Sequence, residues 1–291
     1  MTIASPCTGV CKLDEATGWC LGCGRTGDEM DGWPNQTDAA RQAVWDEIPA
    51  RLTQLGVSCR RLAWTTEEIR SFVMATLTDG SGTWVMGVVG AVAEFTDGGE
   101  GIKVSLDGDA IVAHTRNGAI RMLINDDVRA VTFDQPKLNR EPRTILAVKR
   151  ERGRLPLALG LSDLGGDANA LIKETDARLF DLGLGRKEGR FCVRVNAGRA
   201  QEALGGALGL PFADALPRIG GPLIEESPTR VVESALGRIE VQGQIPPPTA
   251  KSPAGPHTHL LPDHLVTERA LPVGMDLPRA YLPGAIFYPA A

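Results

Sequence analysis

Four cysteines lie within the first 23 residues of this 291-residue chain, and they constrain its folding more than any other feature. They are Cys7, Cys11, Cys20 and Cys23, in the spacing C-x3-C-x8-C-x2-C. Four soft sulfur ligands in one short segment suit a tetrahedral zinc ion or an iron–sulfur cluster. We therefore predict that this segment folds around a metal, with two disulfides or four unused thiols as the alternative.

The second cysteine pair has the better-defined geometry. The run Cys20-Leu21-Gly22-Cys23-Gly24 places two thiolates on one tight turn, which we call the knuckle. Gly22 and Gly24 are expected to adopt positive φ and to direct backbone N–H groups toward the sulfurs. The first pair, with Pro6 before it and Gly9 inside it, is looser.

The residues before the first cysteine favour metal over disulfides. Residues 1–6 have neither a basic region nor an apolar core, so they do not resemble a secretory signal. In a reducing cytosol, thiols remain available for metal. We therefore expect a cytoplasmic protein. No unbroken apolar stretch of about 18 residues occurs, so no membrane-spanning helix is predicted.

The residues around the cysteines also resemble a known family. The shared pattern is Ser5-Pro6-Cys7-x-Gly9-Val10-Cys11-x-Leu13-Asp14, then Gly18-x-Cys20-x-Gly22-Cys23-Gly24-Arg25-Thr26, Asp28-Glu29 and Trp33. Roughly residues 4–55 are similar to a short bacterial four-cysteine family of unknown function, DUF1289, whose members are described as predicted iron–sulfur proteins. The resemblance implies an iron–sulfur cluster, whereas the knuckle looks equally like a zinc ribbon. Zinc and iron–sulfur both stay open.

The charge of the first 60 residues bears on partners. They contain five Lys and Arg residues against eight Asp and Glu residues. Four thiolates around one divalent ion would add about two further negative charges. A zinc ribbon that binds nucleic acid needs the opposite sign, so we predict no nucleic-acid binding. A protein partner or a purely structural role fits better, and whether the protein has a small-molecule ligand stays open.

Local patterns after the cysteines predict both helices and strands. We expect Thr37 to cap a helix that Pro49 kinks or splits, and Thr65 to begin a second helix with a capping box. Between residues 83 and 160, short apolar runs joined by tight turns predict an antiparallel sheet, although residues 84–95 also suit a buried helix. Further helices are expected over 167–182 and 199–208, on either side of a strand at 191–195, and two more strands are expected at 229–232 and 238–241.

Together these patterns predict an α+β protein. A small four-cysteine metal module with helices is followed by a larger domain with a mainly antiparallel sheet and flanking helices. We place the metal module at residues 1–60, the α+β domain at 61–250, and a histidine-containing C-terminal segment, packed on that domain, at 251–291.

Three of the four histidines gather in residues 255–264, whose sequence is Gly-Pro-His-Thr-His-Leu-Leu-Pro-Asp-His. The spacing of His257 and His259 puts two imidazoles on one side of an extended strand, which is common among metal ligands. Asp263, His264 or Glu268 is a candidate third ligand. The alternative is a polar loop whose histidines bond to backbone carbonyl groups.

Residues 80–289 carry a second resemblance. Its motifs are Phe180-Asp181-Leu182-Gly183-Leu184-Gly185, Phe191-Cys192-Val193-Arg194, Gly237-Arg238-Ile239-Glu240-Val241 and Gly255-Pro256-His257-Thr258-His259-Leu260-Leu261-Pro262. They are similar to a family of uncharacterised bacterial proteins. This resemblance implies one domain fused behind the cysteine module and no particular chemistry.

These observations favour a metal-binding protein without catalysis of its own. Four protein sulfurs leave no open position for a substrate, so the cysteine site would be structural or electron-transferring, with Trp33 packed near it. The larger domain would then bind a partner or ligand. The alternative is an enzyme whose site lies around His257 and His259. The remaining cysteines, Cys59 and Cys192, are expected to act as small buried hydrophobes.

Overall fold

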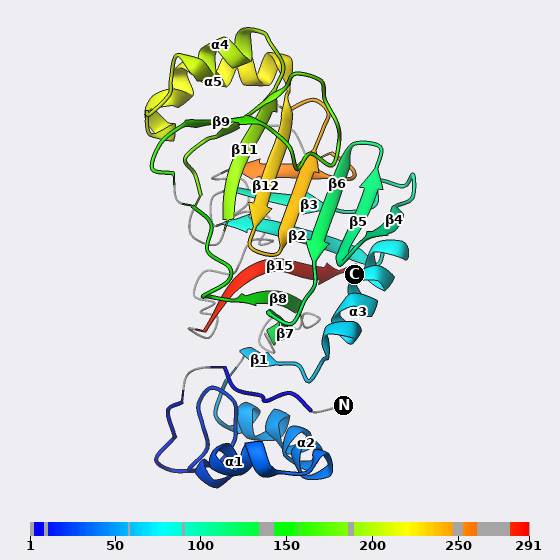
Figure 1. The fold of residues 1–291 in the computed structure, drawn as a ribbon, viewed down its shortest axis with the longest axis vertical. Helices are drawn as coiled ribbons and strands as arrows, with labels where there is room; N and C mark the ends of the chain where they lie inside the picture. The colour runs from blue at the N-terminus through cyan, green and yellow to red at the C-terminus, as the bar shows by residue number, and fades with distance from the viewer. Residues whose placement is uncertain are drawn as a thin grey trace.

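The computed structural model describes residues 3–8, 11–57, 59–88, 91–133, 143–156, 158–185, 189–246, 253–260 and 280–290. Two antiparallel sheets make up the middle of the molecule, and helices lie beside them and at both ends (Figure 1). The fold is therefore α+β, as the sequence predicted.

The N-terminal module contains α1 (Gly27–Gly32), a 3-10 turn (Trp33–Asn35) and α2 (Asp38–Gln54). The Thr37 hydroxyl accepts the Ala40 N–H, so Thr37 caps α2 as expected. Of the two outcomes expected at Pro49, the split into two helices is wrong, because α2 runs through it as one helix of 17 residues. Proline removes one hydrogen-bond donor, whereas the helix buries a continuous apolar stripe. That stripe consists of Val44, Trp45, Ile48 and Leu52.

A short strand and one helix connect this module to the sheets. Strand β1 (Cys59–Arg61) pairs with β7 (Val128–Phe133). Helix α3 (Thr66–Thr78) begins at Thr65, whose capping box with Glu68 is formed as predicted. The buried face of α3 consists of Ile69, Val73 and Leu77, which join the main core.

The first sheet has seven strands in the order β1-β7-β8-β15-β2-β3-β14. Its other members are β8 (Arg143–Lys149), β15 (Tyr281–Pro289), β2 (Gly82–Val88), β3 (Ala91–Phe95) and β14 (His257–Leu260). Within the range 84–95, which suited either a strand or a helix, residues 84–88 belong to β2 and residues 91–95 form β3, and the two strands pair antiparallel. The histidine strand β14 lies at one edge of this sheet, beside β3.

The second sheet has eight strands in the order β4-β5-β6-β13-β12-β11-β10-β9. They are β4 (Lys103–Asp107), β5 (Ala110–Thr115), β6 (Gly118–Leu123), β13 (Gly237–Val241), β12 (Thr229–Ser234), β11 (Gly189–Val195), β10 (Arg178–Asp181) and β9 (Ser162–Gly166). The predicted helix over 167–182 is wrong. Residues 167–177 instead form a loop across the sheet, because their polar groups bond to side chains of β11 and β13.

The main core lies between the two sheets. In Figure 1, β2 and β3 run across the back of β11, β12 and β13. Alternate residues point inward, so Trp84 and Phe95 of the first sheet share one cluster with Phe191 of the second. Burying each such side chain stabilises the fold by roughly 1.5–3 kcal/mol, which makes this layer the main source of stability.

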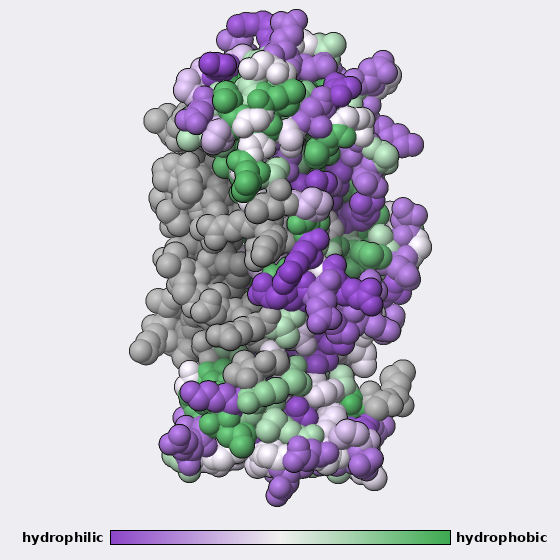
Figure 2. Space-filling view, turned by 60° about the vertical axis from the view of Figure 1, so that its left-hand side comes forward, coloured by the Kyte–Doolittle hydropathy of each residue, from purple (hydrophilic) through white to green (hydrophobic). Residues whose placement is uncertain are grey.

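Two helices, α4 (Arg199–Gly205) and α5 (Phe212–Glu226), lie at the end of the molecule opposite the N-terminal module (Figure 1). Helix α5 was not expected, because it contains Pro217 and Pro222 as well as a Gly-Gly pair. It forms because Ala215, Ile219 and Leu223, spaced by four, bury one face. Its exposed apolar residues, Leu216 and Ile224, belong to the same end, where Figure 2 shows green patches.

Candidate functional site

The knuckle folds as a tight turn held by backbone hydrogen bonds. Cys20 pairs with Leu13 in a β-bridge, and the Gly24 N–H donates to the Cys20 carbonyl at 2.8 Å. Gly24 has a φ of +72°, as expected, whereas Gly22 is not among the residues with positive φ. The Gly22 N–H still points to the Cys20 sulfur, at 3.4 Å. One left-handed residue therefore suffices to reverse the chain around the sulfurs.

The four sulfurs approach one another as two pairs. Cys20 and Cys23 are each only 2% exposed, and a hydrogen-bond interaction between them lowers the pKa of Cys20 to about 5 and raises that of Cys23. In the other pair, the neighbouring Cys7 sulfur is the main cause of the raised pKa of Cys11, and Cys20 adds to the effect. Cys11, Cys20 and Cys23 are free thiols. The arrangement is compatible with metal binding.

An arginine links the knuckle to the aromatic residue expected near it. The Arg25 Nε donates to the Cys23 sulfur at 3.5 Å, and its guanidinium lies 4.9 Å from the centre of the Trp33 ring. Arg25 is only 4% exposed, so its positive charge sits against the sulfurs out of water. A buried cation at this position favours thiolate over thiol.

The cysteine module is attached to the seven-stranded sheet close to Cys7. The Tyr281 hydroxyl of β15 donates to the Cys7 carbonyl at 3.4 Å. The guanidinium of Arg61, on β1, donates to the Ser5 carbonyl. Burial lowers the pKa of Arg61 to about 10. Nearby, Cys59 packs against an apolar cluster on that sheet, whereas Cys192 is fully buried on β11.

The two histidines of β14 meet a buried glutamate that the sequence analysis did not select. His257 lies opposite Glu94 of β3 in the strand register. The Nε2 atoms of His257 and His259 lie 3.5 Å and 3.1 Å from the two carboxylate oxygens of Glu94. Glu94 is fully buried and both histidines nearly so. The other candidates near these histidines, Asp263, His264 and Glu268, lie outside the described residues.

Local backbone geometry explains why this cluster forms. On β3, Ala93 and Phe95 point into the main core, so Glu94 points to the opposite face of the sheet. The Gly255-Pro256 step leads into β14: Gly255 has a φ of +82°, and a Cβ added to Gly118 would lie 2.6 Å from Pro256. Glycine at 118 therefore leaves room for Pro256, and glycine at 255 allows the left-handed turn before β14.

A sequence signal for Glu94 did exist. It is the single charged residue in the apolar run 84–95, and a buried carboxylate needs a cationic or hydrogen-bonding partner. The strand pairing that makes His257 that partner joins residues 163 positions apart, which no local pattern reveals. In the described part of the chain, Glu94, His257 and His259 form a group of possible ligands whose atoms all lie within 4.8 Å of one another.

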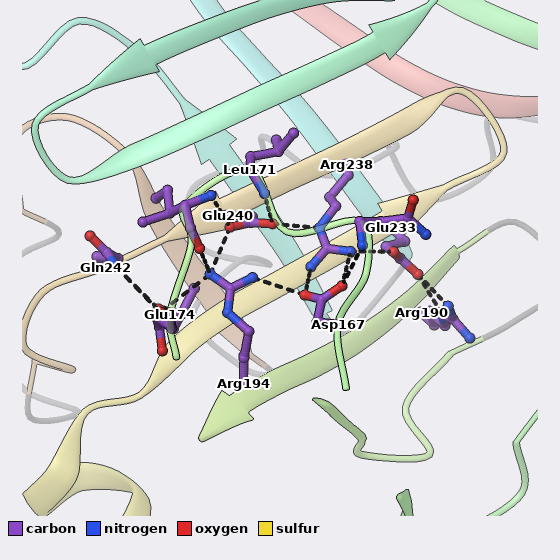
Figure 3. A network of polar contacts seen from close by, with 12 residues as sticks. Asp167, Leu171, Glu174, Arg190, Arg194, Glu233, Arg238, Glu240 and Gln242 are labelled. Atoms are coloured by element: carbon purple, nitrogen blue, oxygen red, sulfur yellow. Dashed lines mark hydrogen bonds and ion pairs between the residues drawn. The ribbon is translucent and has the colours of Figure 1, made fainter. Parts of the chain in front are cut away.

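A second buried polar group lies on the outer face of the eight-stranded sheet (Figure 3). The Asp167 carboxylate accepts from Arg194 at 2.9 Å and from Arg238 at 3.0 Å. The Glu240 carboxylate accepts the backbone N–H groups of Leu171 and Ile172 at 2.9 Å and 3.0 Å. Arg194 and Arg238 also pair with Glu240, at 2.9 Å and 2.7 Å. We call this the arginine–carboxylate network; it ties the loop 167–177 to the sheet.

Comparison with known proteins finds one family for each of the two parts of the chain. The fold and sites define a two-part α+β protein with a cysteine module ahead of a two-sheet domain. Residues 68–291 match the Family of unknown function (DUF6925), so the chain belongs to that family. Residues 5–52 match the Protein of unknown function (DUF1289). Both resemblances found in the sequence, and the fusion of the two parts, are thereby confirmed.

Curated relatives match the cysteine module. Uncharacterized protein YdhL of Escherichia coli (strain K12) is 43% identical over 42 residues, which are 14% of this chain and 52% of the relative. YdhL of Shigella flexneri gives the same values. The chain thus spans about half the length of the curated relatives it matches. No solved structure matches significantly. Among the described helices, none has the length and apolar character needed to cross a membrane.

Proposed function

We propose that Cys7, Cys11, Cys20 and Cys23 together bind one metal ion, and that the N-terminal module is a metal-binding unit. The observation that carries the proposal is the knuckle, in which two buried sulfurs on one turn receive an N–H from Gly22 and a charged donor from Arg25. Such donors stabilise thiolates, the form in which cysteine binds metal. Metal binding would draw the second sulfur pair onto the first.

The pairing of the sulfurs limits the kinds of metal centre that fit the module. Sulfurs bound at about 2.3 Å to one tetrahedral zinc ion lie about 3.8 Å apart. In a [2Fe–2S] cluster each iron also binds two cysteine sulfurs, so two sulfur pairs fit that cluster as well, whereas in a [4Fe–4S] cluster each sulfur binds a different iron. Cys20 and Cys23 interact, and so do Cys7 and Cys11, which fits either arrangement. We propose zinc as the first candidate, because the knuckle resembles that of a zinc ribbon, and an iron–sulfur cluster as the second.

The proposed role is structural or partner-binding rather than hydrolytic. Four sulfur ligands close a tetrahedral site and leave no position for substrate. The module is acidic and stands at one end of the molecule, joined to the sheets beside β1 (Figure 1). We propose that it presents this acidic surface to a protein partner in the cytoplasm, and that an electron-transfer role applies if iron is bound.

Elemental analysis of the full chain tests the metal site. Wild-type protein, purified without oxygen, is compared with Cys20→Ser and with the matched control Cys59→Ser, whose thiol packs against an apolar cluster on the sheet. We expect Cys20→Ser to contain about one zinc equivalent less than the wild type and Cys59→Ser to be unchanged. Equal metal content in wild type and Cys20→Ser contradicts the site. Iron with visible absorption contradicts zinc in favour of the cluster.

A further inference from the structure

The cluster of Glu94, His257 and His259, which we call the His–Glu cluster, contains a second possible ligand set that is independent of the cysteines. Its three ligand atoms come from two neighbouring strands, β3 and β14, at the edge of the seven-stranded sheet. All three residues are at most 6% exposed. Two imidazoles and one carboxylate are a donor set that transition-metal ions bind in proteins.

A hydrogen bond on the far side of His257 determines which nitrogen faces Glu94. His257 Nδ1 lies 2.8 Å from the Gly255 carbonyl oxygen, which can only accept, so Nδ1 carries a proton. In the neutral ring, Nε2 then carries a lone pair, and it faces the Glu94 carboxylate at 3.5 Å. Two electron-rich atoms that face each other in a buried site repel unless a proton or a metal ion lies between them.

The position of His259 also indicates that a proton or a metal ion lies beside Glu94. Its Nε2 lies 3.1 Å from a Glu94 oxygen, yet this atom is buried and makes no hydrogen bond within the described part of the chain. The two imidazole rings are edge to face, with centres 4.6 Å apart. Both Nε2 atoms therefore converge on one carboxylate.

The spacing of these atoms fits one bound ion. Nitrogen and oxygen ligands at about 2.0–2.1 Å from a metal lie about 2.9 Å apart in octahedral geometry and about 3.4 Å apart in tetrahedral geometry. The two observed nitrogen–oxygen distances, 3.1 Å and 3.5 Å, are close to this range. The bond from His257 Nδ1–H to a backbone carbonyl is also the support that metal-bound histidines commonly have.

We infer that Glu94, His257 and His259 bind a divalent transition-metal ion at this sheet edge. Zinc, cobalt, iron and manganese suit two imidazoles and a carboxylate, whereas calcium and magnesium prefer oxygen ligands. A proton shared by the cluster is the competing explanation, since an imidazolium beside a carboxylate satisfies the same electrostatics. The inference does not depend on metal at the cysteines.

Cobalt titration of the metal-free full chain separates the two sites. Cobalt bound by thiolates gives intense charge-transfer absorption, whereas cobalt bound by imidazole and carboxylate gives weak visible bands. Cys20→Ser should lose the thiolate signal and keep one cobalt equivalent. Glu94→Gln should keep the thiolate signal, and its affinity for the other equivalent should fall at least about a hundredfold, the upper end of what losing an outer-shell partner costs.

A second variant and a control complete the experiment. His259→Gln should behave like Glu94→Gln, which keeps the test valid if one variant fails to fold. His114→Gln removes a half-buried histidine from β5, in the other sheet, and should bind cobalt like the wild type. The inference is overturned if Cys20→Ser binds no cobalt with nitrogen and oxygen ligands, or if folded Glu94→Gln or His259→Gln binds it as tightly as wild type. Those results would assign the cluster to a shared proton.

Discussion

Each of the two sheets carries a buried carboxylate with polar partners, and the two carboxylates are neutralised in different ways. In the arginine–carboxylate network, Glu240 receives two backbone N–H groups and two guanidinium groups. In the His–Glu cluster, Glu94 instead faces the Nε2 atoms of His257 and His259. Arginine always brings its own protons, but a neutral imidazole has only one. The carboxylates of the first group are paired with cationic donors in the folded chain, whereas our inference assigns an added metal ion to the second.

The largest loss of stability is expected when the arginine–carboxylate network is broken. Glu240→Ala leaves Arg194 and Arg238 with less compensation and removes the acceptor of two backbone N–H groups, so we expect a loss of roughly 3–5 kcal/mol in the free energy of unfolding. Urea unfolding measures it. The matched control is Glu225→Ala, which breaks the exposed pair with Arg199 and should cost at most about 1 kcal/mol. Equal losses in the two variants would mean that the network is not a stabilising unit.

Of the two buried polar groups, only the His–Glu cluster should stabilise the protein when metal is added. At a free zinc concentration about 100 times the dissociation constant of the His–Glu cluster, the folded state gains about 2.7 kcal/mol. We expect this gain in Cys20→Ser, where the thiolate site is removed, and its loss when Glu94→Gln is added to that background. Thermal unfolding with and without zinc measures it. Equal stabilisation of the single and double variants would contradict the distinction drawn between the two groups.

The network should also respond to acid. Burial alone would raise the pKa of Glu240, but hydrogen bonds from Arg194 and the charge of Arg238 outweigh it, so its pKa lies below the ordinary 4.5. Asp167 is lowered from 3.8 by the same arginines, against the effect of burial. Their stabilisation is therefore complete above these ordinary values and is lost as the pH falls through the lower folded pKa values.

These pKa shifts predict how the stability of the neutral variant Glu240→Gln depends on pH. We expect the stability difference between wild type and Glu240→Gln to be constant from pH 7 down to about 5 and to shrink below the ordinary glutamate pKa. Unfolding free energies at a series of pH values measure it. A difference that grows on acidification would show that Glu240 is protonated in the folded protein near neutral pH.

The smallest effect is expected at the edge of the network. The Gln242 amide donates to Glu174 at 3.4 Å, a long bond on a partly exposed residue. Gln242→Ala should therefore cost only about 0.5 kcal/mol, at the low end for a hydrogen bond. Chemical denaturation again measures it, and a loss above 2 kcal/mol, which is roughly what a buried unsatisfied group costs, would place Gln242 within the stabilising centre.

Local signals were enough to predict the parts of the fold that depend on neighbouring residues. Thr37, Thr65 and Gly24 each have their role set by residues within a few positions, and the sequence predicted all three. The segment 167–177 was misjudged as helix because its conformation depends on Glu240, about 70 residues later. Long-range bonding of this kind overrides local propensity.

The two candidate sites also differ in whether they depend on neighbouring or on distant residues. The knuckle is contained in five consecutive residues, so its thiolates and turn could be predicted directly. The pairing of His257 with His259 followed from strand alternation, but their common partner Glu94 comes from a distant strand. Sequence could show that Glu94 needs a partner, although only the sheet register shows which one.

The position of β15 has a consequence for biosynthesis. This strand is the last along the chain among those described, yet it pairs with β8 on one side and β2 on the other, in the middle of its sheet. Until the ribosome has released residues 281–289, β2 and β8 expose apolar, unpaired edges. A nascent chain of this kind is therefore a natural client for chaperones, and premature stop codons just before residue 281 should yield aggregates rather than a shortened folded protein.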